Sequence, residues 1–199
     1  MNKKQVYQLL RSDNLTIAFD TNAVHEPSRF LSLCDNINRL NEACQCQIHL
    51  VVSAIVHTET LFDLKQKYHE LYDIDDISRV LNRKRINIVP FERCHAQAVA
   101  QLIGQQFITN QQWYRFKRQS CINCLGINIA NIPTPGSGKK CGATVDWLIA
   151  GYAYAESCLL VTDDKGEEFQ GIEKKTTLKD LESAVEQLLI EETIIEKAR

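Results

Sequence analysis

The stretch Leu159-Leu160-Val161-Thr162-Asp163-Asp164 decides the fold, because it is a short apolar run that ends in two acids. A similar run, Thr16-Ile17-Ala18-Phe19, ends at Asp20-Thr21-Asn22 near the start of the chain. Burying an ionised carboxylate costs several kcal/mol unless a partner compensates its charge. Two buried strands that end in aspartate therefore predict a site that binds a cation.

Two further acids lie on predicted helices. Asp146 opens the apolar run Asp146-Trp147-Leu148-Ile149-Ala150-Gly151, in the first turn of a small-residue helix expected over 143–157. Glu59 lies about two turns into a helix that Ser53 is expected to cap and that runs to about Tyr72. Each acid alone also fits an ordinary role, as a turn residue, a helix-dipole partner or a solvated helix residue. The joint pattern favours one acidic site.

The length and composition suit one folded domain. A chain of 199 residues with 44% hydrophobic residues can bury a full core, so we expect a single domain over 1–199 with an N-terminal extension over 1–14. The start Met1-Asn2-Lys3-Lys4-Gln5 leads into no apolar signal region, and no run approaches the roughly 20 apolar residues of a membrane span. We therefore expect a soluble, cytoplasmic protein without a membrane partner.

Charge and cysteine content narrow the classes of partner. The formal net charge is -2, so the whole molecule has no general attraction for nucleic acid, and any such binding must be local. The chain has eight cysteines, but it is not a short secreted chain, the class in which such a count indicates a disulfide framework. Free thiols or a metal site are therefore expected rather than a disulfide framework.

Apolar periodicity predicts an α/β order of elements. Strands are expected over 16–19, 48–52, 86–91 and 159–161, and helices over 3–11, 27–44, 53–72, 75–82, 94–107, 143–157 and 177–197. Strands that alternate with helices favour a central parallel sheet flanked by helices on both faces, with ligands outside the carboxyl ends of the strands. The last helix has one apolar side, which suits packing on its own domain or contact with a second copy or a partner helix.

The segment 113–142 differs from the rest and is predicted to be an inserted loop, because it gathers Pro, Gly and three cysteines. Cys121, Cys124 and Cys141 have the spacing of structural zinc sites, but Thr144 stands where a fourth cysteine is expected. His95, Cys94 or Cys158 could complete the site; the alternative is three free thiols. A bound zinc ion would anchor the insertion beside Asp146.

Aromatic and basic residues alternate at the start of this segment. Aromatic rings can stack on unpaired bases while cations hold phosphates, a combination suited to single-stranded RNA. The alternative is an amphipathic segment that packs its rings on the core and leaves its charges in solvent. The RNA-binding candidates are Trp113, Tyr114, Arg115, Lys117, Arg118, Lys139 and Lys140.

The acidic motifs resemble those of the PIN-domain nucleases over about residues 16–180. The resemblance rests on Asp20-Thr21-Asn22 after a strand, Glu59 in the helix after the second strand, Asp146 before Leu148-Ile149-Ala150, and Thr162-Asp163-Asp164 followed by Phe169. It implies a PIN-like α/β fold and a catalytic quartet of Asp20, Glu59, Asp146 and Asp164. Asn22, Thr162 and Asp163 match supporting positions, and Asp164 is a closer match than Asp163 to the family acid.

A nest of carboxylates suits Mg²⁺ or Mn²⁺, which prefer oxygen ligands. Such an ion can activate water for attack on a phosphodiester, so we expect a divalent-metal-dependent endoribonuclease. The resemblance extends to the toxins of toxin–antitoxin pairs, which implies an antitoxin as a partner. A homo-oligomer is a further expectation. The alternative from another class is a catalytically silent RNA-binding or scaffold protein; the sequence offers no helical arch or helix-hairpin-helix signal for duplex DNA.

Overall fold

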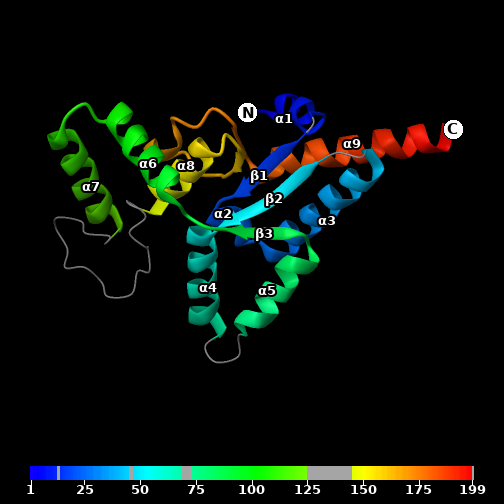
Figure 1. The fold of residues 1–199 in the computed structure, drawn as a ribbon, viewed down its shortest axis with the longest axis horizontal. Coiled ribbons are helices and arrows are strands. Elements are labelled where there is room, and N and C mark those ends of the chain that lie inside the picture. Colours follow the sequence, from blue (N-terminus) through cyan, green and yellow to red (C-terminus); the bar gives the residue numbers. More distant parts are fainter. Residues whose placement is uncertain (13, 45–46, 69–72, 125–144, 199) are drawn as a thin grey trace.

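A five-stranded sheet with every strand parallel to its neighbours forms the centre of the molecule (Figure 1). The structure, a computed structural model, describes residues 1–12, 14–44, 47–68, 73–124 and 145–198, without the side chains of 119–124 and 196–198. The strands are β1 (Leu15–Phe19), β2 (Ile48–Ser53), β3 (Ile86–Val89), β4 (Leu159–Val161) and β5 (Lys175–Thr176), in the spatial order β3-β2-β1-β4-β5. The predicted α/β class with a central parallel sheet is confirmed.

Helices occupy most of the remaining described chain. They are α1 (Lys3–Leu10), α2 (Thr21–Val24), α3 (Pro27–Cys44), α4 (Ala54–Tyr68), α5 (Ile74–Arg83), α6 (Arg93–Gln106), α7 (Asn110–Cys124), α8 (Val145–Ala155), the short 3-10 helix η2 (Glu167–Phe169) and α9 (Leu178–Ala198). Ser53 Oγ accepts a hydrogen bond from Val56 N, 3.3 Å away, which confirms the predicted cap of α4. Within the described residues, no helix has the length and apolar character needed to cross a membrane.

The order of the strands reverses direction at β1, and this point positions the site. The chain moves from β1 outward through β2 to β3, then returns across the sheet to β4 and β5 on the other side of β1. Right-handed crossovers that run in opposite directions place their helices on opposite faces of a sheet. Accordingly, α6 and α8 pack together with η2, whereas α1 and α3 pack with α9. In such sheets, the crevice at the carboxyl ends of the two strands flanking the reversal is the usual ligand site.

The first half of α9 packs on its own domain, whereas Ile190, Ile194 and Ile195 in its second half are exposed. Leu181, Val185 and Leu188 are buried in the main core, which is the simpler of the two arrangements expected for this helix. Arg29 of α3 donates from Nε and Nη2 to the two carboxylate oxygens of Glu182, at 2.7 and 2.6 Å. Such a two-pronged pair fixes the relative position of two helices better than a single contact. It therefore holds α9 against α3.

The first part of the predicted inserted loop is helical. Residues 110–124 form the helix α7, so 113–124 are helical and not a loop as predicted, and 125–142 lie outside the described residues. The helix begins at a reciprocal cap, in which Thr109 Oγ1 accepts from Gln112 N and Gln112 Oε1 accepts from Thr109 N, at 3.3 and 3.0 Å. This Thr-x-x-Gln pattern satisfies two backbone donors that would otherwise lack partners.

One predicted strand ends earlier than expected, and one predicted helix is described only in part. The strand predicted to reach Phe91 ends at Val89, because Pro90 has no N–H to contribute to a strand ladder. The helix predicted to reach Tyr72 is described to Tyr68, and 69–72 lie outside the described residues.

Two glycines give a paired test of the contact between α6 and α8. A Cβ at Gly151 would lie 2.2 Å from Val99 Cγ2 and 3.1 Å from the backbone oxygen of His95, whereas a Cβ at Gly104 meets nothing within 4 Å. We predict that Gly151→Ala lowers the free energy of unfolding by about 1–3 kcal/mol through overpacking. Gly104→Ala should raise it by about 0.5–1 kcal/mol, because alanine suits a helix interior better. Urea unfolding measures both; a shift in the same direction for both variants would contradict the described packing.

Candidate metal centre

Asp20 lies at the end of β1, in the crevice beside β4, and is almost fully buried. Its backbone N donates to Val161 O at 3.0 Å, which continues the pairing of β1 with β4 by one residue. Its Oδ1 accepts from Thr21 N at 2.7 Å, and its Oδ2 accepts from Thr162 Oγ1 at 2.6 Å and Asn22 Nδ2 at 2.9 Å. These contacts fix the direction of the carboxylate.

Thr162 and Asn22 link the ends of the two central strands. Thr162 Oγ1 donates to Asp20 and accepts from Asp164 N at 3.0 Å, so one hydroxyl orients both acidic segments. Asn22 Nδ2 also lies 3.2 Å from Thr162 Oγ1, while Asn22 Oδ1 accepts from Asp163 N at 3.3 Å. Asn22 and Thr162 therefore orient the acids, as a supporting role requires. Asp163 contributes its backbone N–H to this network, and its side chain is exposed.

Asp146, Asp164 and Glu168 form the tightest group of acids. One carboxylate oxygen from each lies within 4.8 Å of those of the other two. Asp146 comes from the first turn of α8, Asp164 from the loop after β4, and Glu168 from η2. Asp164 Oδ1 accepts from Gly166 N at 2.8 Å, a turn that directs the chain back toward the cluster. The structure thus brings two quartet members together and adds an acid that the sequence reasoning missed.

Glu59 flanks this group. It lies on α4, and its Oε2 accepts a short hydrogen bond from Thr21 Oγ1, the residue after Asp20. Asp20 and Asp146 both feel its negative charge. The predicted quartet is therefore gathered at one end of the sheet, with Asp146 and Asp164 in the tight group and Asp20 and Glu59 beside it.

Burial and the charges of neighbouring acids disfavour the ionised forms of Asp146, Asp20 and Glu168. Burial raises the pKa of Asp146 to about 7, with further contributions from Glu168, Asp20, Asp164 and Glu59. Burial also raises the pKa of Asp20 above its ordinary value, against the lowering effect of the Thr162 hydrogen bond. The pKa of Glu168 rises through burial and through Asp164. Without a compensating cation, the cluster therefore tends to hold protons.

The donor set fits a hard divalent cation. Three carboxylates from separate segments offer only oxygen atoms, the ligand type that Mg²⁺ and Mn²⁺ prefer over nitrogen or sulfur. A cavity of about 250 Å³ is lined by Glu168 and Trp147 but not by Asp146, Asp164 or Asp20. Asp146, Asp164 and Glu168 are thus the residues best placed to hold an ion, and Asp20 stands next to them.

The predicted zinc site falls largely outside the described residues. Cys121 and Cys124 lie in the last turns of α7, where the backbone alone is described, and Cys141 is not described. His95 Nδ1 accepts from Glu92 N at 2.7 Å, so the proton is on Nε2, which lies 2.9 Å from Glu156 Oε1, and His95 would have to lose this proton to act as a fourth ligand. A nitrogen that carries a proton cannot coordinate a metal.

Cys158 is also unsuited to zinc. Its thiol is buried, burial raises its pKa to about 12, and its Sγ lies 3.8 Å from Ala153 O. Zinc binds the thiolate, which burial disfavours here. Of the three proposed completing ligands, only the exposed Cys94 retains an accessible donor atom.

Some of the RNA-binding candidates pack on the domain, and others are exposed to solvent. Trp113 stacks with Phe116 at 5.7 Å between ring centroids and meets the edge of Trp147 at 5.9 Å, so its ring packs on the domain. Tyr114 remains 63% exposed, and Arg115 and Arg118 are exposed. Lys117 Nζ lies 5.2 Å from the Trp113 ring and 5.0 Å from the Tyr114 ring. Lys139 and Lys140 lie outside the described residues.

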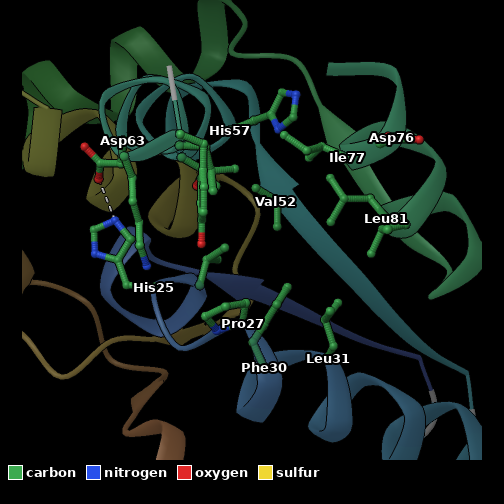
Figure 2. Close-up of a pocket in the computed structure, with 16 residues that line it drawn as sticks. His25, Pro27, Phe30, Leu31, Val52, His57, Asp63, Asp76, Ile77 and Leu81 are labelled. Carbon is green, nitrogen blue, oxygen red and sulfur yellow. Dashed lines mark hydrogen bonds and ion pairs between the residues drawn. The ribbon is translucent and has the colours of Figure 1, made fainter. Parts of the chain in front are cut away.

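A separate cavity of about 520 Å³ lies between α3, α4 and α5 (Figure 2). Its walls are mainly apolar, and His25 Nε2 lies 2.6 Å from Asp63 Oδ2 at one side. His57, whose pKa burial lowers, also lines it. No acid of the quartet and not Glu168 lines this cavity, so it is distinct from the metal centre.

Comparison of the chain with family models finds no match, and comparison with curated proteins finds none either.

The raised pKa of Asp146 predicts a pH-dependent loss of stability in the metal-free protein. Between about pH 4 and pH 7 the folded state binds more protons than the unfolded state, so stability falls as pH rises through this window. Because Asp146 is only partly buried, we expect Asp146→Asn to remove roughly 1–2 kcal/mol of this loss. In EDTA, the variant should match the wild type near pH 5 and exceed its free energy of unfolding at pH 8.

Urea titrations at both pH values measure the effect. Glu167→Gln removes an exposed acid from η2, next to Glu168, and should follow the wild type. Equal pH slopes for the wild type and Asp146→Asn would contradict the assignment.

Proposed function

We propose that this chain is a divalent-metal-dependent nuclease of the PIN type that cleaves RNA. The proposal includes a PIN-like arrangement of the α/β fold, with the segment between α6 and α8 as an insertion. One observation carries it: acids from the end of β1, α4, α8 and the β4 loop gather where the strand order reverses, and carboxylate oxygens of Asp146 and Asp164 lie within 4.8 Å of each other and of Glu168. This is the arrangement expected of the acid quartet of that family.

In this proposal, different residues of the site hold the metal ion and position the acids. A bound Mg²⁺ or Mn²⁺ would supply a water of lowered pKa and neutralise the developing charge on the leaving oxygen. Asp146, Asp164 and Glu168 would hold the ion, and Asp20 would complete the negative site. Thr162 keeps Asp20 and the Asp164 segment in register, because its hydroxyl bonds both.

Glu59 would act indirectly, through Thr21. Its carboxylate accepts from Thr21, whose backbone N–H bonds Asp20, so Glu59 steadies the residue next to the site. It also adds negative charge that deepens the attraction for a cation. The burial that raises the pKa of Asp146 makes exchange of protons for a metal ion part of assembling the site.

The cleavage test compares single acids with a control in the same loop. Wild-type protein with labelled single-stranded RNA and Mn²⁺ should cut, and EDTA should stop it. We predict that Asp146→Asn and Asp164→Asn lower the cleavage rate by about 100-fold or more, since removal of a group that positions a reacting centre costs that much. Glu167→Gln should cut as the wild type does.

The same assay separates the proposed nuclease from its alternative. Cutting that survives EDTA, or that both aspartate variants retain at the wild-type rate, would identify a contaminant and contradict the proposal. RNA binding without any metal-dependent cutting would establish the catalytically silent alternative.

Glu168 is tested by metal binding rather than by cleavage. We predict that Glu168→Gln weakens binding of Mn²⁺ by roughly 10- to 100-fold, because the tight group loses one charged oxygen donor. Glu167→Gln, one residue away and exposed, should bind Mn²⁺ as the wild type does. Calorimetric titration or the signal of free Mn²⁺ measures the affinity. Equal affinity for both variants would remove Glu168 from the metal centre.

A further inference from the structure

The segment between Glu92 and Asp146 carries no acid in a chain that is acidic overall. Residues 93–145 contain Arg93, Arg115, Lys117, Arg118, Lys139 and Lys140 and no Asp or Glu. With a formal net charge of -2 for the whole chain, the remaining residues carry the negative excess. The segment therefore carries a net positive charge, because no acid within it offsets its cations, and among the described residues three of these cations lie on α7.

One face of α7 packs on the domain. Phe116 and Trp113 contact Phe107 at 5.0 and 5.4 Å between ring centroids, and both meet Trp147. Trp147 is buried and follows Asp146 in α8. The aromatic contacts therefore hold α7 next to the start of the helix that carries an acid of the metal centre.

The opposite face of α7 is open to solvent and combines a ring with cations. Tyr114 is 63% exposed, and Arg115 and Arg118, three residues apart on neighbouring turns, are exposed. Neither arginine makes an ion pair with a described residue. Lys117 Nζ, 5.0 Å from the Tyr114 ring centroid, adds a third cation beside the ring. Figure 1 shows α7 at one end of the long axis, with the C-terminal end of α9 at the other.

We infer that the exposed face of α7 binds unpaired nucleotides of a single-stranded nucleic acid, with Tyr114 stacking on a base and Arg115 and Arg118 holding phosphates. A flat exposed ring amid cations matches a strand that alternates flat bases with anions. An acidic peptide would satisfy the charges but would leave the ring without a stacking partner. As a means of presenting substrate to the metal centre, this surface rests on the proposed function; as a binding surface it can be tested alone.

The test measures binding in EDTA, so that cutting is absent. Fluorescence anisotropy with a labelled single-stranded RNA, and with a DNA of the same sequence, compares Tyr114→Ala with Tyr114→Phe. The alanine variant should bind about tenfold more weakly, because a stacked base contributes roughly 1–3 kcal/mol. The phenylalanine variant keeps the ring and should bind as the wild type does. Wild-type affinity for Tyr114→Ala on both strands would overturn the inference.

The phosphate contacts are tested by salt dependence. For R115Q/R118Q, the slope of log affinity against log salt should fall by about 1.4, since each phosphate contact to a single strand contributes roughly 0.7. K3Q/K4Q removes the same charge from exposed positions on α1 and is the matched control. An equal effect of the two double variants would show general charge attraction only and would overturn the inference.

Two competitors identify the class of ligand. Polyglutamate should displace the strand poorly, and a duplex of the same sequence should bind with no dependence on Tyr114. Equal competition by polyglutamate would indicate an acidic protein partner and overturn the inference. The two proposals can fail separately. If the α7 variants bind more weakly but the wild-type protein does not cut RNA, the binding surface is supported and the proposed nuclease function is rejected. If the wild-type protein cuts RNA in a metal-dependent way but the α7 variants bind as tightly as the wild type, the nuclease function is supported and the binding surface is rejected.

Discussion

The hydrogen bond from Thr162 Oγ1 to Asp20 Oδ2, 2.6 Å long, joins two strand ends that are 142 residues apart in the chain. It forms because β1 and β4 are neighbours in the sheet, which in turn requires the chain to reverse its direction of strand addition. The same hydroxyl accepts from Asp164 N, so one side chain sets the position of two acidic segments. A slip of either strand by one residue would turn these side chains to the other face of the sheet.

The acids gathered at this point oppose folding, and other parts of the molecule compensate. Burial raises the pKa of Asp146 to about 7, so its ionised form is destabilising unless a cation is present. Asp20 is held by a backbone N–H, a hydroxyl and an amide, none of which neutralises its charge. The stabilising contribution comes from elsewhere, including the buried side of α9 and its Arg29–Glu182 contact with α3. The stability of the frame thus offsets the cost of the acids at this edge of the sheet.

The parts of this arrangement that depend on local pattern could be predicted from the sequence. Apolar runs that end in Asp20 and Asp164 identified two central strands and the edge at which their acids meet. Glu168 was missed because its role depends on the turn through which Gly166 N bonds Asp164 Oδ1, a contact that brings η2 back to the site. Gly166 so soon after Asp164 was the available signal. The hydrogen bonds of His95 could not be predicted either, because its tautomer depends on the backbone N–H of Glu92, which sequence spacing does not reveal.

The helix α8 couples the metal centre to two other parts of the fold. Asp146 lies in its first turn, Trp147 next to it anchors the aromatic face of α7, and Gly151 one turn later allows α6 to approach closely. His95 of α6 then reaches Glu156, just past the end of α8, so both ends of the helix are fixed. A shift of α7 would act on Trp147 and through it on the residue beside it. The position of Asp146 thus depends on packing of the α6–α7 segment as well as on its own helix.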